Sequence, residues 1–110
     1  MTPLSSADVD LELARQEWEE GSRRVERARR EPARYARLNR HVELVAADLR
    51  RRVGLSFTLE ELARAYDDAD DWAPDLLHEA TLEGEPPAES SMVADAAFHL
   101  YARGAADYAP

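Results

Sequence analysis

Large and small apolar side chains alternate along the first thirty residues, three or four positions apart. Leu11, Trp18 and Val25 are spaced by seven residues, and three small residues repeat with the same spacing between them. Because an α-helix turns once in about 3.6 residues, this pattern places all six side chains on one helix face. The small members would let a second helix approach closely. We therefore predict a long helix that packs on the following helix, on a second copy or on another protein through these partner-contact residues: Leu11, Ala14, Trp18, Gly21, Val25 and Ala28.

Pro32 interrupts this pattern, because proline breaks a helix interior but is accepted in a first turn. The apolar positions that follow are shifted in register and predict a second helix from Pro32 to Val53. Gly54 is suited to end that helix, since glycine adopts the positive φ of a helix C-terminus at little cost. The sequence is compatible with two arrangements of this helix pair, a hairpin or one kinked rod.

The segment after Gly54 carries a clear start signal for a third helix. Thr58 and Glu61 have the spacing of a capping box, in which each side chain bonds the backbone N–H of the other residue. The aspartates of the run 67–71 are typical turn and cap residues, so we expect them to end this helix. A fourth helix is then predicted from Trp72 to Leu82, with Pro74 in its first turn.

A last helix is predicted from Met92 to Arg103, after a loop that contains Pro86 and Pro87. Its apolar residues cover more than one face, which indicates a central position in the core. No window alternates as a β-strand would. The sequence therefore predicts an all-α fold of five helices in a single domain, residues 1–110. Two longer N-terminal helices with a heptad-like seam would join a compact, acidic three-helix bundle.

Charge divides the chain at Gly54. All 14 basic residues are arginine, and 23 acidic residues give a net charge of −9. Residues 1–53 hold 12 arginines and 10 acids, a net of +2, whereas residues 54–110 hold 2 arginines and 13 acids, a net of −11. We expect this asymmetry to attract a partner or to be neutralised where one half packs on the other.

The segment 58–82 has the outline of a helix-turn-helix, and Phe57–Ala63 is similar to the first helix of many bacterial repressors and sigma-like domains. A DNA-binding transcription regulator is therefore the alternative hypothesis. Its reading helix would present Asp75, His78 and Glu79, however, and carboxylates repel phosphate. DNA binding through this unit is not expected.

A second route to nucleic acid is offered by seven of the arginines in the first two predicted helices: Arg23, Arg24, Arg27, Arg30, Arg34, Arg37 and Arg40. Glutamates alternate with them, and pairs such as Glu19 and Arg23 are spaced by four residues, which favours ion pairs on one helix. A salt-bridged face, or docking onto the acidic half of the same chain, explains the arginines better than a nucleic-acid partner does.

No catalytic, cofactor or metal site is predicted. The chain has no cysteine, and its three histidines fall in separate predicted helices without a metal-binding spacing. Asp95 and His99 are four residues apart, and we expect a hydrogen bond between them on the helix surface.

The N-terminus lacks the features of a secretory signal, and no apolar run is long enough to cross a bilayer, so a cytoplasmic location without membrane contact is expected. The hypothesis from sequence is a small, non-enzymatic interaction or regulatory protein. It would act through helix–helix contacts with a protein partner or a second copy, and its acidic C-terminal surface would contact a basic partner.

Overall fold

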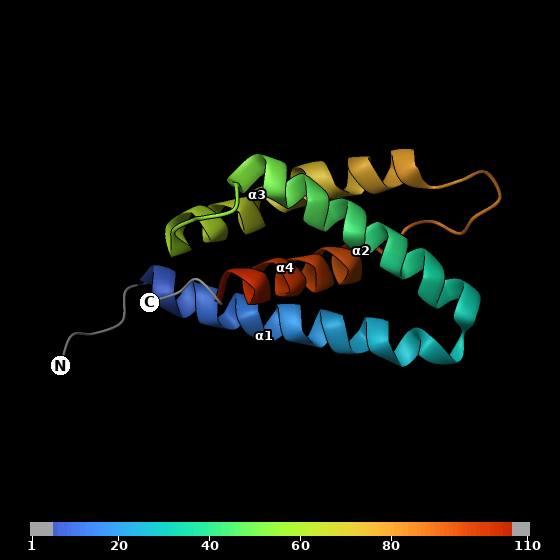
Figure 1. Ribbon diagram of the computed structural model, residues 1–110, viewed down its shortest axis with the longest axis horizontal. Coiled ribbons are helices and arrows are strands. Elements are labelled where there is room, and N and C mark those ends of the chain that lie inside the picture. Colours follow the sequence, from blue (N-terminus) through green and yellow to red (C-terminus); the bar gives the residue numbers. More distant parts are fainter. Residues whose placement is uncertain (1–5, 107–110) are drawn as a thin grey trace.

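A computed structural model describes the backbone of residues 6–106 and the side chains of residues 12–58 and 60–103. These residues form four α-helices, α1 (Ser6–Arg27), α2 (Pro32–Val53), α3 (Leu59–Ala80) and α4 (Ser90–Ala106), the short 3-10 helix η1 (Ala28–Arg30) and the segments that connect them. Figure 1 shows them as an elongated bundle. The predicted all-α class is confirmed, and the predicted number of five helices is wrong.

The second helix has the predicted limits. Pro32 occupies the first turn of α2, and Gly54 follows its last residue with a φ of 95°. The chain reverses at η1 and Glu31, so α1 and α2 form a hairpin rather than a rod. Its two arms make little direct contact, and α4 lies between them (Figure 1).

The error in helix number lies in α3, which is one continuous helix where two helices and a turn were predicted. Aspartate is a poor helix former, but it costs well under 1 kcal/mol per residue in a helix interior. Ala69, Ala73 and Leu77 continue the buried stripe that begins at Leu62, so packing carries the helix through the aspartate run. Pro74 therefore lies inside α3 and not in a first turn.

α4 occupies the centre of the molecule, as its apolar faces predicted. It packs most extensively on α1 and next on α2, and its contact with α3 is smaller. Leu100, at 46% exposure, is the exception among its predicted core positions. The C-terminal half thus contributes two helices rather than a bundle of three, and α4 is shared with the N-terminal hairpin. Its buried apolar side chains are Met92, Val93, Ala96, Ala97, Phe98 and Tyr101.

The start of α3 is fixed by the predicted capping box. The Glu61 N–H donates to Thr58 Oγ1 over 3.1 Å, and the Thr58 N–H donates to Glu61 Oε1 over 3.3 Å. These bonds satisfy two backbone donors at the ends of the cap.

Replacing Thr58 with alanine should therefore lower the free energy of unfolding by about 1 kcal/mol. Urea denaturation followed by circular dichroism measures this loss. Thr58→Ser keeps the hydroxyl and serves as the control, and an equal loss in both variants would contradict a capping role.

Candidate functional site

The predicted partner-contact face of α1 lies inside the protein. Ala14, Trp18, Val25 and Ala28 are each at most 8% exposed, and Gly21 is buried as well. The Leu11 side chain lies outside the described residues. The part of the face within α1 packs on α4, where Gly21 lies against Asp95 and the backbone of Met92 and Ala96. Ala28 lies in η1, which contacts α2. The described residues of this face are therefore occupied within the chain and offer no surface to a partner.

Trp18 is the largest side chain on that face and the centre of an aromatic cluster. Its ring stacks on Phe98 of α4 with centroids 5.3 Å apart, and it meets Tyr66 of α3 edge-on at 5.2 Å. The indole N–H is buried without a hydrogen-bond partner among the described residues. Trp18 thus joins three helices.

The outer face of α3 is strongly acidic. Five carboxylates lie on it, all exposed, and none forms an ion pair with any described residue. Successive members spaced by four residues repel one another, at a cost of about 0.2–0.5 kcal/mol per pair. We call this surface the acidic ridge: Asp67, Asp68, Asp71, Asp75 and Glu79.

Many carboxylates elsewhere in the structure are used internally. Glu19, Glu20 and Glu26 pair with arginines of α1 and η1. Asp48 of α2 is 4% exposed and accepts hydrogen bonds from Arg51 and Arg52. The acidic ridge therefore differs from these carboxylates in being both clustered and unpaired among the described residues.

Two further ion pairs fasten the loop before α4 to α2. Arg34 donates two hydrogen bonds to Glu89, and Arg40 donates to Glu85 over 2.7 Å. The hydrogen bonds from Arg34 lower the pKa of Glu89 despite the opposing effect of burial. The arginines of the N-terminal half thus bind glutamates of their own helices and of the acidic half, the two alternatives to nucleic acid considered above.

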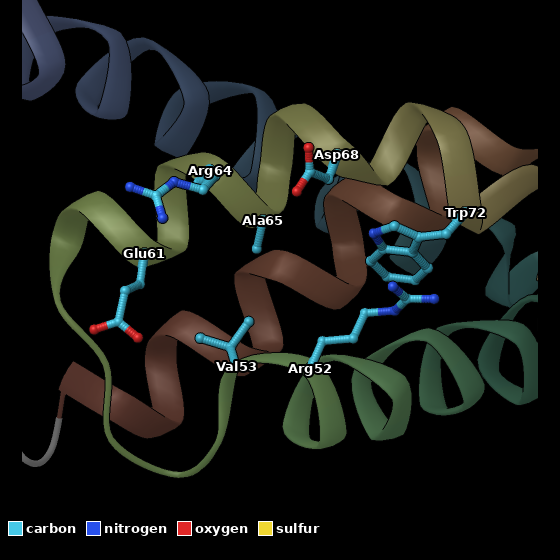
Figure 2. A pocket seen from close by; sticks show the side chains of 7 residues that line it. All are labelled: Arg52, Val53, Glu61, Arg64, Ala65, Asp68 and Trp72. Atoms are coloured by element: carbon cyan, nitrogen blue, oxygen red, sulfur yellow. The ribbon is translucent and has the colours of Figure 1, made fainter.

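A groove separates the end of α2 from the first half of α3 (Figure 2). The guanidinium of Arg52 lies 4.4 Å from the centre of the Trp72 ring, a cation–π contact. Asp48 orients that guanidinium. Burial disfavours the charge of Asp48, but the arginine hydrogen bonds outweigh it and lower the pKa. Val53 and Ala65 line the middle of the groove, which encloses about 350 Å³.

A second, larger hollow of about 750 Å³ lies on the other side of α3, between α1, α3 and α4. The Tyr66 hydroxyl lies 2.7 Å from Glu17 Oε2 and 2.9 Å from Asp95 Oδ1 at this cleft. Burial raises the pKa of Asp95, and hydrogen bonding to Tyr66 opposes this rise only in part. The predicted hydrogen bond between Asp95 and His99 is absent from the described residues, because Asp95 turns toward α3.

Sequence reasoning missed this cluster and the contact between Arg52 and Trp72. Each joins side chains from different helices, so no local spacing reveals it. The only sequence signal was the position of Tyr66 on the apolar face of its helix, where a hydroxyl group needs a polar partner.

Other predicted or alternative sites have no counterpart among the described residues. The described residues contain no group of three histidine or acidic side chains that could hold a metal ion. The helix-turn-helix outline is absent, since residues 59–80 form a single helix. None of the described helices combines the length and apolar character that spanning a bilayer requires.

Comparisons with protein-family models, curated proteins and solved structures give no match to this chain.

Proposed function

We propose that this protein is a small, non-enzymatic interaction protein whose acidic ridge on α3 binds an arginine- or lysine-rich segment of a protein partner. The observation that carries the proposal is the contrast between the ridge and the acidic residues that are paired within the chain. Five exposed carboxylates on one helix face remain without an ion pair among the described residues.

The cost of the ridge supports this proposal. Asp67, Asp71, Asp75 and Glu79 follow one another at intervals of four residues, so three like-charged pairs each weaken α3. Basic side chains of a partner would relieve this repulsion on binding, and the ridge would steer such a partner from a distance.

A titration with a basic peptide tests the proposal. The probe is a synthetic peptide in which lysine and arginine alternate with alanine, followed by amide chemical shifts of the labelled protein at low salt. We expect the largest shift changes along α3. The triple variant Asp67→Asn, Asp71→Asn, Asp75→Asn should bind about three- to tenfold more weakly, since three exposed ion pairs each contribute a few tenths of a kcal/mol.

A variant of equal net charge provides the matched control. Glu12→Gln, Glu19→Gln and Glu26→Gln remove three exposed carboxylates from α1 and should change the affinity less than twofold. Equal losses in the two triple variants would show attraction to net charge alone and would overturn the proposal. Self-association at low salt that the ridge variant abolishes would also overturn it, in favour of a second copy as the partner.

A further inference from the structure

The phenol of Tyr66 has one proton to donate but contacts two hydrogen-bond acceptors. Its hydroxyl lies within hydrogen-bond distance of carboxylate oxygens on two other helices, Glu17 on α1 and Asp95 on α4. One O–H group donates one full hydrogen bond. If both carboxylates are ionised, one of these contacts brings two oxygens together without a proton between them. A second proton on one carboxyl group removes the conflict.

Asp95 is the group suited to hold that proton. Burial raises its pKa, and the neighbouring charges of Glu17 and Asp70 raise it further. Tyr66 and Arg24 act in the opposite direction without cancelling the rise. Glu20 of α1 also lines the cleft, so acidic groups outnumber the single arginine around it. His99 lies one turn further along α4.

We propose that Glu17, Tyr66 and Asp95 form a proton-dependent clamp that holds α1, α3 and α4 together and loosens as the pH rises. With Asp95 protonated, Tyr66 donates to Glu17 and the Asp95 carboxyl donates to the Tyr66 oxygen. When Asp95 loses its proton, two carboxylates compete for one hydroxyl group and repel each other. α3 then moves away from α1 and widens the cleft between them.

The direction of this pH effect follows from linkage. A carboxyl group whose pKa is higher in the folded protein binds its proton more tightly there than in the unfolded chain. Its contribution to stability is present below the ordinary value of 3.8 and is lost as the pH rises through the raised value. The clamp is therefore closed in acid and open at higher pH. It is independent of the proposed function, because the acidic ridge contains none of its three residues.

Two measurements test the clamp. Carbon-13 NMR of the aspartate carboxyl groups gives the pKa of Asp95 directly, with Asp95→Asn to assign the signal, and we expect a value above 3.8. Spin labels on Arg15→Cys and Asp71→Cys, two exposed positions in a chain without other cysteines, report the separation of α1 and α3. We expect this separation to increase from about pH 4 to about pH 8.

Variants separate the clamp from a general effect of pH. Asp95→Asn supplies an amide N–H in place of the carboxyl proton, so its separation should stay short throughout the pH range. Asp70→Asn removes a neighbouring charge but does not contact the Tyr66 hydroxyl. The separation of α1 and α3 should therefore still increase with pH, and the increase should occur at a lower pH than in the protein that keeps Asp70. A pKa of Asp95 at or below 3.8 would overturn the proposal. So would a distance between α1 and α3 that does not change with pH when Glu17, Tyr66 and Asp95 are all present. The proposal would also be overturned if the separation of α1 and α3 increased with pH by the same amount in Asp95→Asn as in the protein that keeps Asp95.

Discussion

Replacing Trp18 with alanine is expected to lower the free energy of unfolding by about 3–5 kcal/mol, a large share of the roughly 5–15 kcal/mol available to a domain of this size. Trp18 is 1% exposed and contacts the rings of Phe98 and Tyr66. Its removal leaves a cavity where three helices meet. Urea denaturation followed by circular dichroism measures the loss.

Two other variants make this prediction specific. Leu13→Ala, at a side chain that is 56% exposed on the same helix, should change the free energy of unfolding by less than about 0.5 kcal/mol. Trp18→Phe should cost less than Trp18→Ala, because it keeps an aromatic ring and removes an indole N–H that has no described partner. Losses of similar size at Trp18 and Leu13 would contradict the central position of the Trp18 ring.

Gly21→Ala is expected to destabilise the protein by about 1–2 kcal/mol, although the same change in an exposed helix interior stabilises by up to about 1 kcal/mol. A Cβ atom on Gly21 would overlap Asp95 Cβ and lie 3.1 Å from the Ala96 backbone nitrogen. It would also lie 3.2 Å from the Met92 carbonyl oxygen. Two of these neighbours are backbone atoms, so α1 and α4 must move apart.

A double-mutant cycle isolates this close approach. Asp95→Gly removes the Cβ atom that the new methyl group would overlap, so the double variant Gly21→Ala, Asp95→Gly should lose less stability than the sum of the single losses. Thermal and urea unfolding of the four proteins give the coupling. Strict additivity would show that the new methyl group does not clash with the Cβ atom of Asp95.

The limits of α2 and the start of α3 were predictable because they depend on local chemistry. Pro32, Gly54 and Thr58 each act on backbone groups within a few residues. Pro32 lies in the first turn of α2, Gly54 follows its last residue with a positive φ, and Thr58 caps α3. The continuity of α3 was not predictable in this way. An aspartate run suits both a turn and an exposed helix face, and the choice depends on burial of Ala69 and Ala73 against other helices.

The seam of α1 shows the same division. Gly21 and its neighbours predicted a close helix contact, and that contact exists. Neither the spacing nor the residue types indicated α4, because the choice of neighbour depends on the shape of a helix far along the chain. The carboxylates of the acidic ridge were visible in the sequence as the aspartate run 67–71 and as Asp75 and Glu79, but pairing within the fold decides which carboxylates remain free.

The place of α4 between α1 and α2 determines when the native contacts of the helical hairpin can form during translation. Phe98 follows Trp18 by 80 residues, so during translation the hairpin is complete long before the ring that covers Trp18 exists. Until then the nascent chain presents an uncovered apolar seam, the kind of surface that chaperones bind. Contacts between such distant segments also slow folding. The native contacts between Trp18 and Phe98 can therefore form only after α4 has left the ribosome.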